Sequence, residues 1–227
     1  TQRVGGELLE GFRPHRHLAR LWSLDKAQNV DDLMAWHARV LKLINEYNAK
    51  NPDDPLPPPT FVVELKFDGL SLTLTYDGGR LVQASTRGNG IVGEGILPQV
   101  KTIRSIPLEI PYRDGIIEVQ GEGMMFLSVF EAYNKTAAEP LKNPRNAAAG
   151  ALRNLNPKVT AERKLDAFLY NVGYSDNIRF RDHGEMVEFL RENRFKVSPY
   201  LQFYDSIEAV AEELKRLESV RHDFDFL

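Results

Sequence analysis

The stretch LSLTLTYDGGRLVQAST, residues 70–86, limits most strongly what this chain can fold into. In its first half, apolar residues alternate with serine and threonine, so an extended chain would have one apolar and one polar face. The DGG segment at 77–79 then supplies a tight turn, and residues 80–86 run back. This pattern predicts an antiparallel β-hairpin.

Helices are expected on both sides of this hairpin. Asn29 is a candidate N-cap with two acidic residues in the first turn, and apolar residues then recur at helical spacing until the proline-rich connector NPDDPLPPP (51–59). Strands are predicted at 61–68, 115–126 (a strand pair or one bulged strand) and 166–174, and helices at 127–138, within 143–157, and around 183–194 and 206–219. Residues 1–28 are expected to be irregular. The sum is an α+β domain built on antiparallel sheet with flanking helices.

Composition excludes several kinds of site. The 227 residues are 42% hydrophobic, which is enough for a core, and the net charge of −3 is not that of a protein held to nucleic acid by bulk charge. A local basic patch remains compatible with this balance. The absence of cysteine excludes disulfides, zinc–thiolate sites and a catalytic thiol within the chain. The absence of cysteine also leads us to expect an intracellular protein. No signal peptide is visible, and because there is no 18-residue apolar run we expect no membrane span.

The ELKFDGL stretch at 64–70 is the first candidate for chemistry. If the strand that begins at Phe61 continues, Glu64, Lys66 and Asp68 share one face, and the apolar flanks predict that they are buried. An amine becomes a nucleophile once it loses its proton, whereas neighbouring carboxylates hold that proton on. The triad by itself is therefore equally compatible with an ordinary solvated strand face. Gly69, which follows directly, permits close approach of backbone to a ligand.

Two further motifs have weak individual signals. Arg87, in the glycine-rich loop TRGNGIVGEG (86–95), suits a phosphate or a ribose, but a surface arginine in a hairpin loop would give the same pattern. Glu122, after Gly121, could accept a hydrogen bond from a ribose hydroxyl or help to hold Mg²⁺, or could simply end a strand.

The segment NPRNAAAGALR (143–153) combines small residues with two arginines. Arg145 and Arg153 are eight positions apart, about two helical turns, and so lie on roughly the same side of a helix. Cations beside a helix N-terminus favour phosphodiester contacts, and a solvated basic rim is the alternative. Among the five histidines, His15 and His17 could share a strand face, but no third ligand is evident in the sequence, so no metal site is predicted.

The order of these motifs is more specific than any one of them. Lys-x-Asp-Gly, then Thr-Arg-Gly-x-Gly, Gly-Glu and the alanine-rich arginine segment together resemble the adenylation domain of bacterial NAD-dependent DNA ligases, over nearly the whole chain. SLDKA (23–27) resembles a further element of that family. The resemblance implies an ATP-grasp-like nucleotidyltransferase fold, a cytoplasmic and monomeric enzyme, NAD as AMP donor, Mg²⁺, and nicked double-stranded DNA as partner.

The resemblance also implies residue roles. Lys66 would attack the α-phosphorus of NAD and form a lysine–AMP intermediate, and Asp68 would position it. The cofactor would be held by six residues: Ser23, Leu24, Glu64, Arg87, Glu122 and Tyr170. Arg145 and Arg153 would contact DNA at the nick.

The same resemblance predicts a domain truncated at both ends and incomplete for nick sealing. It would comprise an N-terminal segment and helix (1–50), the connector (51–59) and a nucleotidyltransferase core (60–227) lacking its last strands. Three positions depart from the family pattern: Asn89 stands where aspartate is usual, Gln120 where arginine is usual, and Gly95 lies in a changed Gly-Glu-Asp element.

Two other functions are compatible with parts of the pattern. A relative that keeps the fold but has lost the chemistry would bind nicks without forming an adduct. A ligase or capping enzyme that uses ATP or GTP would share Lys-x-Asp-Gly, but it gives no reason for the alanine-rich arginine segment.

Overall fold

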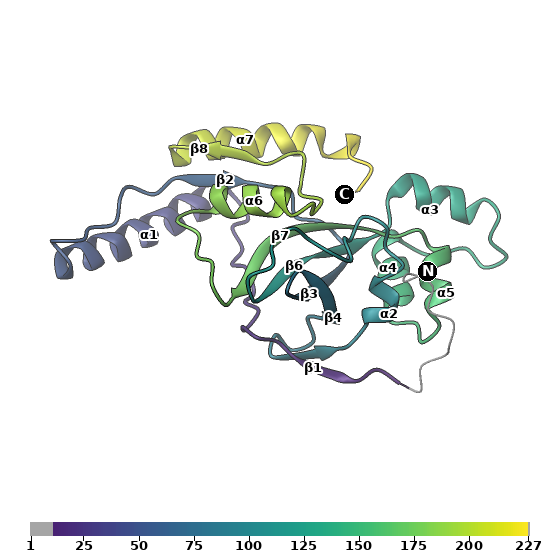
Figure 1. The fold of residues 1–227 in the computed structure, drawn as a ribbon. Helices are drawn as coiled ribbons and strands as arrows, with labels where there is room; N and C mark the ends of the chain where they lie inside the picture. The colour runs from purple at the N-terminus through teal and green to yellow at the C-terminus, as the bar shows by residue number, and fades with distance from the viewer. Residues whose placement is uncertain (1–10, 227) are drawn as a thin grey trace. The chain divides into compact units, whose positions relative to one another are not determined.

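The computed structural model describes residues 11–226, and residues 1–10 and 227 lie outside the described part. The chain divides into two compact units (Figure 1). The first unit contains the chain up to Trp22, then Lys66–Pro199 and the chain from Asp225 onward. The second unit contains Ser23–Leu65 and Tyr200–Phe224.

The first unit is built on a four-stranded antiparallel sheet in the order β4-β3-β6-β7. Its strands are β3 (Leu70–Asp77), β4 (Arg80–Thr86), β6 (Ile116–Met124) and β7 (Asp166–Ser175). The predicted hairpin is confirmed as β3 and β4. It turns at Gly78 and Gly79, whose φ values of +53° and +81° require the left-handed region that glycine adopts without strain. A separate two-stranded ribbon pairs β1 (Pro14–Arg16) with β5 (Val92–Glu94).

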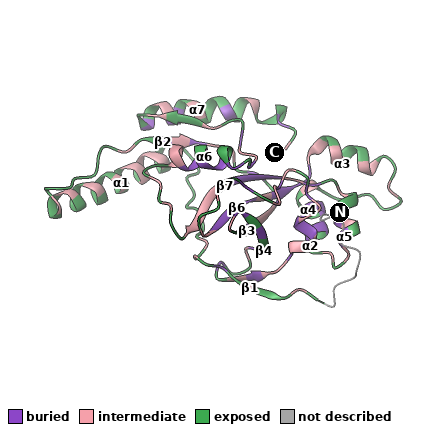
Figure 2. Ribbon diagram, viewed as in Figure 1, coloured by how far each residue is buried: buried purple, intermediate pink, exposed green. Residues whose placement is uncertain are grey.

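The two faces of this sheet differ in chemistry. The apolar face carries fully buried side chains such as Leu72, Leu74 and Val119. On the opposite face the register pairs polar residues across β3 and β6, namely Ser71 with Glu122, Thr73 with Gln120 and Thr75 with Glu118. Three of these polar residues, Thr73, Thr75 and Glu118, are nevertheless buried. Most of β3 and β6 is coloured as buried in Figure 2. Burying polar groups costs free energy unless they are paired, so this face is where a functional site is expected.

Among the described residues, the first unit has five helices: α2 (Leu97–Val100), α3 (Leu127–Asn134), α4 (Pro144–Leu152), α5 (Pro157–Glu162) and α6 (His183–Glu192). The start of α4 follows from its sequence, because the Asn143 side chain accepts a hydrogen bond from the Asn146 N–H at 2.8 Å and Pro144 occupies the first turn. The helix packs on the apolar face, where Leu152 lies beside Gly123 of β6.

The second unit contains α1 (Val30–Lys50), α7 (Ile207–Val220), the short 3₁₀ turn η1 (Arg221–Asp223), and a ribbon of β2 (Phe61–Val63) with β8 (Gln202–Tyr204). Asn29 caps α1 as predicted, accepting from the Asp32 N–H at 2.8 Å. The proline-rich connector is tied back to this helix, because the Asn48 side chain bonds both the N–H and the carbonyl of Leu56.

Several sequence-based expectations were wrong. β2 ends at Val63, so residues 64–68 do not continue the strand, and Lys66 and Asp68 are exposed rather than buried. Of the two alternatives predicted for residues 115–126, the structure has the single strand, β6, whose pairing with β7 is irregular at two places. β1 lies in a segment expected to be irregular, and α5 was not predicted. No helix within residues 11–226 combines the length and the apolar character that crossing a bilayer requires.

Candidate active site

Lys66 and Asp68 lie on an irregular segment that is fixed by its neighbours. Between them, Phe67 is buried and stacks on Phe168 of β7, with ring centroids 4.3 Å apart and planes 9° from parallel. Gly69 is packed so tightly that a Cβ added there would lie 2.1 Å from the carbonyl oxygen of Gly123. The buried ring and the tight glycine hold the backbone, so that the amine and the carboxylate project outward from a fixed position.

Asp68 pairs with the first of the two predicted DNA-binding arginines. Its carboxylate lies 3.1 Å from the Arg145 guanidinium in the first turn of α4, and both side chains are more than half exposed. An exposed pair of this kind contributes at most about 1 kcal/mol to stability. The pair therefore orients the groups more than it holds the fold together.

Glu122 is half-buried and is the least exposed member of this group. The Ser71 hydroxyl, directly across the sheet, donates to its Oε2 at 3.1 Å. Burial raises the pKa of the Glu122 carboxyl, while hydrogen bonds from Ser71 and the Gly69 backbone and the charges of Lys66 and Arg145 lower it. The amine and the guanidinium are thus within electrostatic reach of this carboxylate. We call Lys66, Asp68, Glu122 and Arg145 the lysine cluster.

Arg87 lies half-buried at the start of the glycine-rich loop. Its carbonyl accepts a hydrogen bond from Nε2 of His17 at 3.0 Å, which fixes the loop to the chain that follows β1. The loop bends at Gly88 and Gly90, whose φ values are +57° and +86°. A Cβ at Gly90 would lie 2.7 Å from the carbonyl oxygen of Leu21, so this glycine is also required for packing.

Asn89 preserves the hydrogen bonds of this loop despite its departure from the family pattern. Its Oδ1 accepts from the N–H groups of Ile91 at 2.9 Å and Val92 at 2.8 Å. An aspartate oxygen could accept the same two bonds, so the substitution retains the turn geometry. Gln120, the second departure, accepts from the Asn171 side chain at 2.8 Å.

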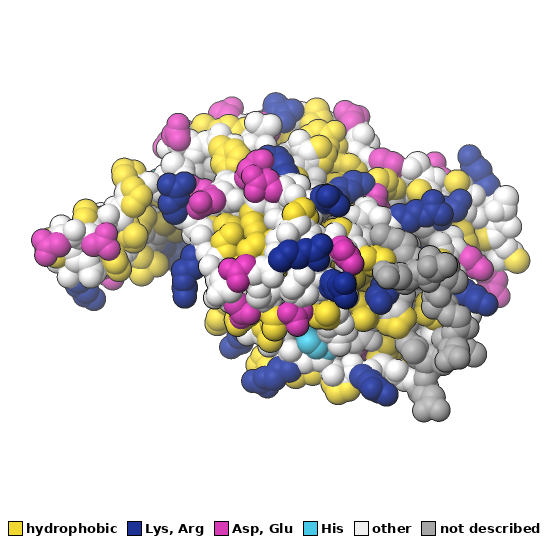
Figure 3. Space-filling view, in the orientation of Figure 1, with side chains coloured by type: hydrophobic (Ala, Val, Ile, Leu, Met, Phe, Trp, Pro, Cys, Tyr) yellow, Lys and Arg dark blue, Asp and Glu magenta, His cyan; other side chains and the backbone are white. Residues whose placement is uncertain are grey.

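Arg153 has a partner of its own. It caps the end of α4, and its guanidinium makes a two-pronged contact to Glu94 of β5, at 2.8 and 3.2 Å. Arg145 and Arg153 therefore lie at opposite ends of one helix and pair with different carboxylates. Over the face shown in Figure 3, cationic and anionic side chains are interspersed, in keeping with the small net charge.

Tyr170 lies on β7 at a bulge. Gln120 pairs with Asn171 and Gly121 pairs with Leu169, so Tyr170 is the additional residue of β7 between these pairs. A bulge re-aims the side chain that it carries, which sequence alternation alone cannot show.

The remaining predicted cofactor residues belong to the second unit. Ser23 and Leu24 are exposed in the irregular chain before α1, and Glu64 follows the end of β2. The structure thus brings four of the ten predicted site residues into the lysine cluster within the first unit. Arg87, Arg153 and Tyr170 lie on other parts of the same unit.

Sequence reasoning missed several polar residues around this site. Ser71, which bonds Glu122, was taken only as part of an alternating pattern. Glu118 is fully buried two strand positions before Gln120, and burial raises the pKa of its carboxyl. The sequence contained a signal for these residues. Glu118, Gln120 and Glu122 are spaced two apart, and residues at this spacing share one face of a strand.

Comparison with known proteins agrees with this geometry. Residues 9–227 match the family model described as the NAD-dependent DNA ligase adenylation domain. Over all 227 residues the chain is 56% identical to a DNA ligase of Alkaliphilus oremlandii, 51% to one of Alkaliphilus metalliredigens and 49% to one of Finegoldia magna. It spans about a third of the length of these curated relatives, 33%, 33% and 34% respectively.

Proposed function

The chain belongs to the NAD-dependent DNA ligase adenylation domain family, and from this premise we propose that Lys66 takes AMP from NAD. In the whole ligase, AMP would then pass to the 5′-phosphate of a nick, and the 3′-hydroxyl would displace it. The observation that supports this proposal most directly is the lysine cluster, in which an amine, two carboxylates and a guanidinium gather beside a polar sheet face. We further propose a cytoplasmic monomer that acts in DNA replication and repair.

The chemistry assigns each member of the lysine cluster a task. Lys66 Nζ forms a bond to the α-phosphorus of NAD, the bond from that phosphorus to the bridging oxygen breaks, and nicotinamide mononucleotide leaves. The amine must give up a proton to attack, and a neighbouring carboxylate is a suitable acceptor. The Arg145 guanidinium, paired with Asp68, is suited to phosphate oxygens because of its forked donors.

The residues present fit a nucleotide that carries phosphate and ribose. Glu122 offers a half-buried carboxylate of the kind that binds a ribose hydroxyl, and Arg87 follows the last residue of β4 at a glycine-rich bend. We propose that Tyr170 stacks on the adenine, that Glu64 reads its edge, and that Ser23 and Leu24 line the same site. Asp68 and Glu122 would hold Mg²⁺, which when bound neutralises phosphate charge.

The test of this proposal is a chimera, because the chain matches only a third of its relatives. We expect that a ligase of Alkaliphilus oremlandii, in which this chain replaces the matching third, gains the mass of one AMP when incubated with NAD and Mg²⁺. Peptide mapping should place the adduct on Lys66, and ATP should give none. The unaltered relative is the positive control. An adduct on the relative but not on the chimera would contradict the proposal, and an adduct from ATP would identify a different donor.

The DNA contacts are tested separately. We expect Arg145→Ala and Arg153→Ala each to weaken binding of a nicked duplex by the chimera. Each should lower the slope of log K against log salt by about 0.9, because one phosphate contact and its counterion release are lost. Arg181→Ala is the matched control, since Arg181 is also exposed and paired with a carboxylate, Glu185. Slopes unchanged from the Arg181→Ala value in both variants would show that neither arginine contacts phosphate.

A further inference from the structure

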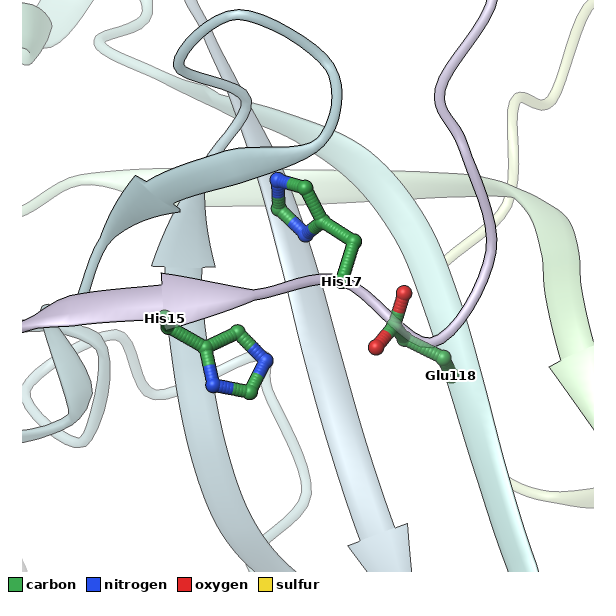
Figure 4. Close-up of side chains that lie close together, drawn as sticks. All are labelled: His15, His17 and Glu118. Carbon is green, nitrogen blue, oxygen red and sulfur yellow. The ribbon is translucent and has the colours of Figure 1, made fainter.

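Three side chains outside the lysine cluster converge at another part of the first unit. His15 lies on β1, His17 follows the end of β1, and Glu118 lies on β6. One atom suited to metal binding from each residue lies within 4.8 Å of the other two. Figure 4 shows the two imidazole rings and the carboxylate gathered around one point, although Glu118 lies more than 100 positions after the histidines in the chain.

Each residue of this cluster has a buried polar atom with no hydrogen-bond partner among residues 11–226. These atoms are Nε2 of His15, Nδ1 of His17 and Oε1 of Glu118. Glu118 is fully buried and His17 is 6% exposed. Buried polar atoms are nearly always paired, because an unpaired one keeps its whole desolvation cost. A single bound species that contacts all three atoms accounts for them together.

The hydrogen bonds made by the other polar atoms of His17 and Glu118 leave lone pairs on the atoms that face this point. The Arg87 carbonyl can only accept, so His17 donates from Nε2 at 3.0 Å, and in the neutral ring Nδ1 then bears the lone pair. The Leu18 N–H donates to Oε2 of Glu118 at 3.1 Å, which leaves Oε1 available. A hydrogen bond from the far nitrogen of a histidine to a carbonyl is the usual support of a metal-binding imidazole.

The donor set selects the kind of ligand. Two imidazole nitrogens and one carboxylate oxygen suit Zn²⁺ and neighbouring divalent transition metals, whereas Mg²⁺ and Ca²⁺ prefer oxygen donors throughout. A water molecule is the competing occupant. A single water accounts for all three atoms only by donating to His17 Nδ1 and Glu118 Oε1 and accepting from a protonated His15 Nε2, and titration with Zn²⁺ decides between the two occupants.

We propose that His15, His17 and Glu118 bind one divalent transition-metal ion, for which Zn²⁺ is the best fit. The ion joins β1 to β6 of the central sheet. Because His17 also bonds the Arg87 carbonyl, the ion steadies the start of the glycine-rich loop. We assign the site a structural role because His17 and Glu118 are buried and because it shares no residue with the lysine cluster. This inference does not depend on the adenylation chemistry.

The test is calorimetric titration of the metal-free 227-residue chain with Zn²⁺. We expect one ion per chain, and an affinity at least about 100-fold lower in His15→Gln and in Glu118→Gln, because each loses a direct ligand. His222→Gln is the matched control, since His222 is an exposed histidine on η1. Titration with Co²⁺ should add visible absorption bands in the wild type and the control only.

Circular dichroism separates loss of binding from loss of fold. Glutamine keeps the shape of Glu118, and His15 is only half-buried, so at least His15→Gln is expected to fold and to decide the test. A wild type that takes up no Zn²⁺, and whose melting temperature Zn²⁺ does not raise, has a water-bridged network instead and overturns the proposal. Binding to folded His15→Gln as tight as to the wild type overturns it as well.

Discussion

Replacement of Lys66 by arginine is expected to abolish AMP transfer and leave the fold intact. Arginine keeps the positive charge beside Glu122 but remains protonated, so it cannot supply a nucleophilic nitrogen. Nick sealing by the chimera should fall by about 10⁴-fold or more, as when other enzymes lose their nucleophile. Because Lys66 is exposed, the free energy of unfolding should change by less than about 0.5 kcal/mol. Gel-based sealing and mass spectrometry measure the activity, and thermal melting measures the stability.

Two controls make this result specific to the attacking amine. Lys135→Arg changes another exposed lysine, at the end of α3, and should leave sealing unchanged. A nick whose 5′-phosphate already carries AMP bypasses the lysine adduct, so Lys66→Arg should still seal it. Persistence of the AMP adduct in Lys66→Arg would show that another residue is the nucleophile.

Replacement of Gly69 by alanine is expected to cause a large loss of stability. The new Cβ would lie 2.1 Å from the Gly123 carbonyl oxygen. Gly123 belongs to the backbone of β6, and Gly69 directly precedes the partner strand β3, so neither the Cβ nor the carbonyl can rotate away. Overpacking of this kind costs about 3 kcal/mol, and a chain of this size should then melt roughly 6 to 12 °C lower. Because Glu122 receives a hydrogen bond from the Gly69 backbone, adduct formation should fall as well.

Gly150→Ala is the matched control for Gly69→Ala. Gly150 lies inside α4, and a Cβ added there meets nothing within 4 Å. Alanine is the better helix former by about 1 kcal/mol, so this variant should be as stable as the wild type or more so. Equal melting temperatures for Gly69→Ala and the wild type would mean that the two strands separate more easily than their packing indicates.

The parts of the fold that the sequence predicted are those specified by local chemistry. The hairpin of β3 and β4 was predicted because two glycines in succession supply the left-handed turn between alternating segments. The helix α1 was predicted because Asn29 is a capping residue followed by helical periodicity. Each signal depends on residues close together in the sequence, and the same residues form the turn or the capping hydrogen bond.

The errors concern partners distant in the chain. The pattern of alternation continues past Val63, but a strand needs a hydrogen-bonded neighbour, and β8 pairs with Phe61–Val63 only. β1 was missed for the same reason, because its pairing with β5 depends on residues about 80 positions away. Alternation indicates which way side chains point and does not indicate where the partner strand ends.

For the candidate site, the order of the motifs predicted the family, and the comparisons confirmed it. The residue roles within the site stay predictions. The sequence could name Lys66, Asp68, Glu122 and Arg145 as candidates, but their distances from one another depend on how β3, β6 and α4 pack. Likewise, His15 and His17 acquired a third neighbour only when β1 was placed beside the sheet.

The sequence by itself determined the family, the hairpin, the capped helices and the identity of the candidate nucleophile. Each of these depends on the types of residues that lie close together in the chain. Only the tertiary structure decided that Lys66 projects from an irregular segment, that the half-buried Glu122 lies within electrostatic reach of it, and that two histidines meet Glu118. Exposure and electrostatic environment are set by chain segments far apart in sequence, whose approach no local pattern specifies.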